Sequence, residues 1–282
     1  MGTVRRCGRL PVLMLASMAV FAVLFGFVIP ASPSAAQGGA VTLEWFGWSH
    51  FRLTSVNGKV ILINPYIEGN PDAAISVDDI TKADLILPAD GHGDELGSTV
   101  PLALKTGAKI LGPGELRTWI AEQGVPRDQL PGGNPGSRMI LDGVTVRVVH
   151  AIHSTGVPKP TMTAPYGGIA TGFIITFENG WTVYFTGSSS ATQDQALWGE
   201  LYKPDAVIFH MSGDKEPLDA AATIRYTMNS NPNLKVLIPH HHRVNPPAGA
   251  TTIADVQGAL SSMGITIPIM EPVRSQVYTF TK

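Results

Sequence analysis

The sequence predicts an α/β protein in which two mixed β-sheets face each other and helices cover their outer faces, a four-layer α/β/β/α sandwich. Short apolar runs rich in Val, Ile and Phe recur along residues 41–282, and glycine-containing turn pairs lie beside them. Stretches with helical 3.6-residue spacing lie between the runs. Hairpin-rich segments are followed by strand–helix alternation, and this order occurs twice, as expected for two mixed sheets.

Each predicted strand is a short apolar run that ends near turn residues. Asn57-Gly58, Asp142-Gly143 and Asn179-Gly180 mark tight hairpins, because these residue pairs adopt the backbone conformation that such turns require. The expected strands cover residues 41–46, 51–54, 60–63, 85–87, 144–149, 172–177, 182–185, 206–209 and 236–238.

The predicted helices lie between these strands. Residues 115–123, 217–228 and 253–263 carry apolar side chains at helical spacing, which is typical of a helix with one face packed on a sheet. A further helix is expected directly after the acidic turn at residues 90–97.

The first 36 residues differ from the rest of the chain. Residues 5–9 carry three arginines and residues 10–29 are an almost unbroken apolar run. Small residues follow, with Ser34 and Ala36 placed for cleavage before Gln37. Residues 1–36 are therefore predicted to be a secretory signal peptide ahead of a domain at residues 37–282, and the protein is expected to be exported to the periplasm or secreted. The alternative is an uncleaved membrane anchor, since the apolar run approaches the ~20 residues that span a bilayer.

Charge and cysteine content exclude several classes of function. The net charge of −2 provides no basic stripe, which argues against nucleic-acid binding. The expected partner is a small-molecule substrate, with no stable membrane contact once the leader is removed. The single cysteine, Cys7, lies in the leader, so the domain has no disulfide, cysteine-based zinc site or cysteine nucleophile. A transition metal would have to be held by His, Asp and Glu.

Metal-ligating side chains gather in a glycine-rich turn after the strand at residues 85–87. Asp90, His92, Asp94 and Glu95 lie within six residues, at the carboxyl end of a strand, where sites collect in α/β sheets. The glycines between them allow a sharp backbone turn, so that the side chains can converge. The alternative interpretation is a solvated acidic turn.

Other predicted strands are also followed by polar side chains. His153 follows the strand at 144–149, Ser188 the strand at 182–185, and His241 the strand at 236–238. Their recurrence after separate strands, together with the acidic turn, indicates one shared site. His240 and His242 are expected to point away from His241, as supporting or surface groups. His210 and Asp214 follow another predicted strand and are expected to line the mouth of the site.

The order of these motifs resembles the metallo-β-lactamase fold superfamily, and within it the ascorbate-6-phosphate-lactonase-like hydrolases. The resemblance spans roughly residues 41–280 and rests on residues 45–51, 63–66, 69–71, 90–95, 153–154, 199–205, 219–221 and 238–241. It implies that His92, Asp94, His153 and His241 are metal ligands. Asp90 and Glu95 stand where the family's His-x-His-x-Asp-His turn has histidines, and Ser188 stands where the family has an aspartate that bridges two metals.

These replacements favour oxygen ligands over nitrogen ligands. We therefore expect one divalent cation per chain, with manganese or iron competing well against zinc. Its metal-bound hydroxide would attack an ester, lactone or phosphoester, with Asp94 or Glu95 moving the proton. Two alternatives remain open at this stage: a catalytically silent binding protein on a degenerate fold, and a structural metal that joins the two halves of the sandwich.

Overall fold

The computed structural model describes residues 39–157 and 166–282. The predicted signal peptide at residues 1–36 lies outside the described residues. No helix within the two described ranges is long and apolar enough to cross a membrane.

The first sheet contains six strands in the order β12-β1-β2-β3-β4-β5. The pairs β12–β1, β1–β2 and β2–β3 are antiparallel, whereas the pairs β3–β4 and β4–β5 are parallel. Their bounds are β1 (Val41–Trp45), β2 (Phe51–Thr54), β3 (Val60–Ile63), β4 (Leu85–Leu87), β5 (Lys109–Ile110) and β12 (Tyr278–Phe280).

The second sheet has the same character, with six strands in the order β11-β10-β9-β8-β7-β6. The pairs from β6 to β9 are antiparallel, and β9, β10 and β11 run parallel to one another. The strands are β6 (Arg138–Leu141), β7 (Val144–His150), β8 (Thr171–Thr176), β9 (Thr182–Phe185), β10 (Ala206–His210) and β11 (Val236–His240).

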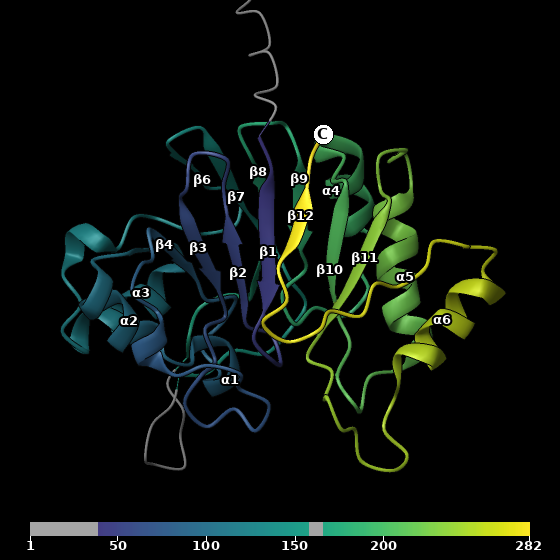
Figure 1. Ribbon diagram of the computed structural model, residues 1–282, viewed down its shortest axis with the longest axis horizontal. Helices are drawn as coiled ribbons and strands as arrows, with labels where there is room; N and C mark the ends of the chain where they lie inside the picture. Colours follow the sequence, from purple (N-terminus) through teal and green to yellow (C-terminus); the bar gives the residue numbers. More distant parts are fainter. Residues whose placement is uncertain (1–38, 158–165) are drawn as a thin grey trace, which may run out of the picture. The chain divides into compact units, whose positions relative to one another are not determined.

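Three buried apolar clusters define the four layers. One cluster lies between the sheets and includes Phe51 of β2 and Phe185 of β9, whose rings meet edge to face at 6.4 Å. The other two clusters lie between each sheet and its helices. Figure 1 shows α2 and α3 beside the first sheet and α5 and α6 beside the second. The helices are α1 (Gly93–Leu96), α2 (Thr99–Thr106), α3 (Gly114–Glu122), α4 (Asp194–Tyr202), α5 (Pro217–Met228) and α6 (Ile253–Ser262), with 3₁₀ turns at Val77–Asp79 and Arg127–Gln129.

The predicted α/β/β/α sandwich is confirmed, but the expected elements left out the strands β5, β6 and β12 and the helix α4. The strands β5 and β12 contain two and three residues, which is too short for a periodic signal. The helix α4 contains Gly199, a residue that disfavours helix. A Cβ at this position would collide with the carbonyl of Thr227 on α5, so glycine allows the two helices to approach closely.

The parallel strands determine where polar side chains meet. The carboxyl ends of β3 and β4 lie at one edge of the first sheet, and those of β9, β10 and β11 lie at one edge of the second. Glu95 of α1, which follows β4, lies 2.9 Å from His241, which follows β11. The loops from both sheets therefore contribute to one site at this edge.

Candidate metal centre

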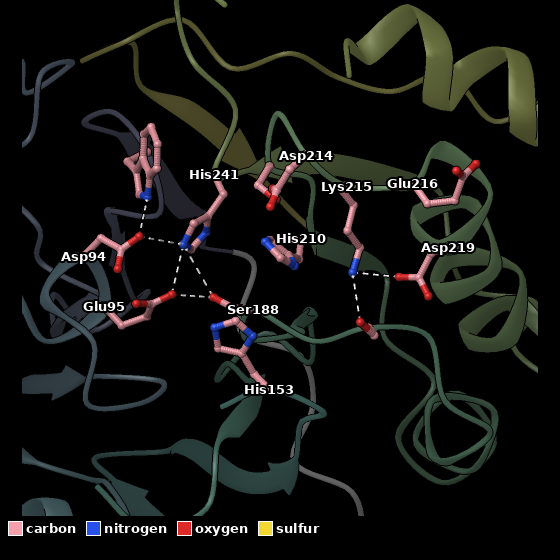
Figure 2. A pocket seen from close by; sticks show the side chains of 13 residues that line it. Asp94, Glu95, His153, Ser188, His210, Asp214, Lys215, Glu216, Asp219 and His241 are labelled. Carbon is pink, nitrogen blue, oxygen red and sulfur yellow. Dashed lines mark hydrogen bonds and ion pairs between the residues drawn. The ribbon is translucent and has the colours of Figure 1, made fainter. Parts of the chain in front are cut away.

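A polar cavity of about 610 Å³ lies at the carboxyl ends of these strands. Its only large aromatic lining residue among the described side chains is Trp48; the others are acidic, basic or hydroxylated (Figure 2). The lining comprises Trp48, Asp94, Glu95, His153, Ser188, Ser190, His210, Ser212, Asp214, Lys215, Glu216, Asp219 and His241.

The first group of potential metal ligands consists of Asp90, His92 and His153. One donor atom from each lies within 4.8 Å of the others, and the two imidazole rings are 5.1 Å apart. Asp90 is fully buried. Its Oδ1 accepts a hydrogen bond from the main-chain N of His92 at 2.9 Å, which fixes the turn, while its Oδ2 has no partner among the described residues.

The second group consists of Asp94, Glu95 and His241, whose donor atoms also lie within 4.8 Å of one another. His241 Nε2 lies 2.9 Å from Glu95 Oε1 and 3.5 Å from Asp94 Oδ2. Glu95 is 1% exposed, and its Oε2 lacks a partner in the described part of the chain. The predicted site residues thus come together, divided between two adjacent groups.

Charge interactions determine the protonation of the second group. Burial lowers the pKa of His241, but its hydrogen bonds to Asp94 and Glu95 outweigh burial and raise the pKa to about 9. Burial raises the pKa of Glu95, and the neighbouring Asp90 and Asp94 add to this effect, although the hydrogen bond with His241 opposes it. Without a cation, a proton on His241 therefore partly balances the crowded carboxylates.

Trp48 holds the second group in place. Its indole Nε1 donates a hydrogen bond to Asp94 Oδ2 at 2.9 Å, and its carbonyl accepts one from the main-chain N of His241 at 3.1 Å. Ser49 Oγ donates to the carbonyl of Asp94. The backbone φ of Trp48 is +56°, a conformation that residues other than glycine rarely adopt. The loop after β1 thus fixes ligands that come from both sheets.

Ser188 occupies the centre of this arrangement. Its hydroxyl donates a hydrogen bond to Glu95 Oε1 and lies 3.4 Å from His241 Nε2. Gly187 before it has a φ of +64°, and a Cβ there would collide with the carbonyl of Thr171. Only glycine is compatible with this turn, which points residue 188 at the second group.

The far end of the cavity is organised by a buried lysine that the sequence analysis did not identify. Lys215 Nζ lies 2.7 Å from Asp219 Oδ2 and donates to the carbonyl of Ser189 at 3.1 Å. Asp219 also accepts hydrogen bonds from the main-chain N of Ala191. These contacts connect the loops after β9 and β10 to α5, and Figure 2 shows the pair of Lys215 and Asp219.

The histidines beside His241 are not surface groups, which corrects one part of the prediction. His240 is fully buried and stacks on Phe185 at 4.5 Å, and His242 is 4% exposed and stacks on Trp45 at 4.5 Å. The prediction assumed an extended segment, but His241 has a φ of +65°. This turn brings His240 Nδ1 to within 2.7 Å of His241 Nδ1, so the two rings do not point apart.

The two expected mouth residues both line the cavity. Asp214 accepts a hydrogen bond from Ser212 Oγ at 2.6 Å. His210, by contrast, is 8% exposed and lies on the inner wall. Figure 2 shows it between His241, His153 and Lys215.

The donor chemistry of both groups is compatible with a divalent cation. Each group combines imidazole nitrogen with carboxylate oxygen, the ligands that zinc, iron and manganese accept. The unpartnered oxygens of Asp90 and Glu95 are buried, and a buried charged oxygen without a partner is costly. A bound cation would satisfy the oxygen of Asp90, and the oxygen of Glu95 is open to a cation or to a proton.

Comparison with known proteins identifies relatives and proteins of the same fold. A UPF0173 metal-dependent hydrolase of Thermodesulfovibrio yellowstonii is 33% identical over 226 residues, covering 77% of this chain and 84% of the relative. The solved structure of Igni18, a metallo hydrolase of Ignicoccus hospitalis, is 26% identical with a TM-score of 0.68, covering 86% of this chain and 98% of Igni18. The metallo-β-lactamase fold protein YhfI of Bacillus subtilis shares the fold, with a TM-score of 0.60 at 11% identity over 86% of this chain and 100% of YhfI. No protein-family model matches the chain.

The two facing mixed sheets with their outer helices have the fold of the metallo-β-lactamase superfamily, as the sequence resemblance predicted. Within it, the chain belongs to the UPF0173 metal-dependent hydrolase family.

The substitution Trp48→Phe tests the support that Trp48 gives to Asp94. It keeps the aromatic ring but removes the Nε1 donor, so we expect metal affinity to fall by roughly tenfold, as is typical when a group that orients a ligand is lost. Isothermal titration of metal-depleted protein measures this. Trp198→Phe is the matched control, because Trp198 lies on α4 and its indole nitrogen has no partner among the described residues. Equal affinities for the two variants would contradict the role of Trp48.

The raised pKa of His241 predicts a pH dependence of the metal-depleted protein. The pKa of His241 is 6.5 in the unfolded chain and about 9 in the folded protein, so the folded state holds this proton more tightly. Protonation of His241 therefore stabilises the folded protein fully below pH 6.5, and this contribution is lost as the pH rises through about 9. The buried imidazoles of His50 and His242, with pKa values lowered by burial to about 3 and about 4, affect stability below this window.

We therefore expect the free energy of unfolding, measured by urea titration in a chelator, to decrease between pH 6.5 and 9. His241→Asn should flatten this decrease. Stability that is constant or rises over this window in the unmodified protein would show that His241 carries no proton between the two carboxylates.

Proposed function

We propose that this chain is an exported metal-dependent hydrolase that cleaves an ester, lactone or phosphoester bond in a small polar molecule. The observation that supports it most is the convergence of six potential ligands, three carboxylates and three imidazoles, in two adjacent groups, of which the second borders an open cavity. The polar lining of that cavity is suited to a hydroxylated or charged substrate rather than an apolar one.

Asp90, His92 and His153 would hold one cation, and Asp94, Glu95 and His241 would offer a second position. The high proportion of oxygen ligands favours manganese or iron in competition with zinc. When bound, a divalent cation supplies Lewis acidity, which activates water near neutral pH and stabilises negative charge that develops on the substrate.

The chain's own residues handle the proton and position the substrate. Asp94 already contacts Trp48 and His241. Glu95 Oε2 accepts no hydrogen bond from the described residues and lies 4.0 Å from His92 Nδ1. We therefore assign to Glu95 Oε2 the acceptance of the proton from the attacking water and its transfer to the leaving group. Trp48 and Lys215 both line the cavity, and Figure 2 shows Asp94 and Lys215 on opposite sides of His210. The substrate would lie between these sides.

Two variants test the metal site and the reaction together. His92→Ala and His153→Ala each remove an imidazole from the first group, so each should lower metal affinity by about tenfold or more and abolish hydrolysis. Metal content is measured by elemental analysis, and hydrolysis on a panel of lactones, carboxylic esters and phosphodiesters. His150→Ala is the control, because His150 is half-buried at the end of β7 and pairs with Asp194 at 3.3 Å.

The panel also separates the alternatives. A protein that takes up no manganese, iron or zinc, and whose melting temperature these ions do not raise, would be a silent binding protein. A protein that binds metal but is inactive on the whole panel, and unfolds when the metal is removed, would use the cation as a structural clamp. Either result would contradict the hydrolase proposal.

Export is supported by the arginines, apolar run and small residues of the first 36 positions. Amino-terminal sequencing of the protein purified from its native host should begin near Gln37. A chain that starts at Met1 and is recovered from the cytosol would contradict this proposal.

A further inference from the structure

The parallel strands β9, β10 and β11 bring a third imidazole to the second ligand group. These strands are neighbours in the order β11-β10-β9, and parallel strands present their carboxyl ends at the same edge. Ser188 follows β9, His210 ends β10, and His241 follows β11. Because β10 is the middle strand, His210 lies between the other two positions.

The surroundings of His210 are well defined. Its main-chain N donates a hydrogen bond to Thr186 Oγ1 at 3.2 Å, and its residue pairs with His240 across the sheet. The side chain is 8% exposed, and Nδ1 has no hydrogen-bond partner among the described residues. A buried imidazole nitrogen without a partner is unfavourable unless a ligand satisfies it.

His210 lies against one imidazole from each ligand group. Its ring centre is 5.0 Å from that of His241 and 6.2 Å from that of His153, and both pairs are close to perpendicular. Two imidazoles that bind one ion through nitrogens at about 2.1 Å have ring centres about 5 Å apart at a tetrahedral angle. The spacing of His210 and His241 agrees with this value, and so does the 5.1 Å between His92 and His153 in the first group.

The second group needs such a ligand. Asp94, Glu95 and His241 supply three donors, and tetrahedral metal sites take four. Ser188 provides a hydroxyl where the superfamily resemblance implies a bridging carboxylate, and that hydroxyl already donates to Glu95. An imidazole from the adjacent strand can make up for this weaker donor.

We propose that His210 is a further metal ligand of this chain, supplying a ring nitrogen to the cation of the Asp94–Glu95–His241 group. This inference rests on the proposed metal-dependent function.

The test uses cobalt(II), a spectroscopic substitute for the native cation, added to the metal-depleted full-length protein. Calorimetric titration measures stoichiometry and affinity, and visible absorption reports the coordination of the ion. His210→Ala and His210→Gln should each lower cobalt affinity at one site by about tenfold or more and change the absorption bands. His242→Ala is the matched control, because His242 is also a buried imidazole without a partner in the described chain, yet it lies outside this cavity.

The outcomes separate this inference from the proposed function. His210 variants that fold, by near-ultraviolet circular dichroism, and bind cobalt with unchanged affinity and spectrum would overturn the role of His210 alone. An unmodified protein that binds no cobalt, manganese, iron or zinc would overturn the proposed function as well. If His210→Ala does not fold, His210→Gln decides the question, because the amide keeps a polar side chain at the end of β10.

Discussion

Three carboxylates buried at one edge of the sandwich are the constraint on which the rest of the site depends. Asp90 and Glu95 are almost fully buried and Asp94 is partly buried beside them, so their negative charges repel strongly in a medium of low dielectric constant. In the metal-free protein the proton on His241 offsets part of this repulsion. A divalent cation would offset more of it and would also satisfy the unpartnered oxygen of Asp90.

The residues that form the site come from both sheets. The acidic turn follows β4 of the first sheet, whereas His153, Ser188 and His241 follow strands of the second. Trp48 connects them, since it binds Asp94 through its side chain and His241 through its main chain. Behind the site, the packing of Phe51 on Phe185 holds the two sheets against each other. The geometry of the site is therefore a property of the sandwich rather than of any one loop.

Much of this arrangement is predictable because ligands follow strands. The runs before Asp90, His153, Ser188 and His241 are apolar and end at recognisable turns, so their convergence follows from the sheet alone. The role of Trp48 is not predictable in this way, because it depends on a hydrogen bond between residues 46 positions apart. The burial of His240 and His242 was missed because alternation along an extended strand fails where His241 adopts a positive φ. Lys215 was missed because its partners lie on a different loop and helix.

Anomalous diffraction from crystals grown with manganese tests the central claim most directly, namely that the two groups of imidazoles and carboxylates are cation sites. The account predicts an anomalous peak within bonding distance of Asp94, Glu95 and His241 or of Asp90, His92 and His153. Crystals at saturating manganese and at saturating zinc with no anomalous peak at either group, or with the ion bound elsewhere on the chain, would contradict it.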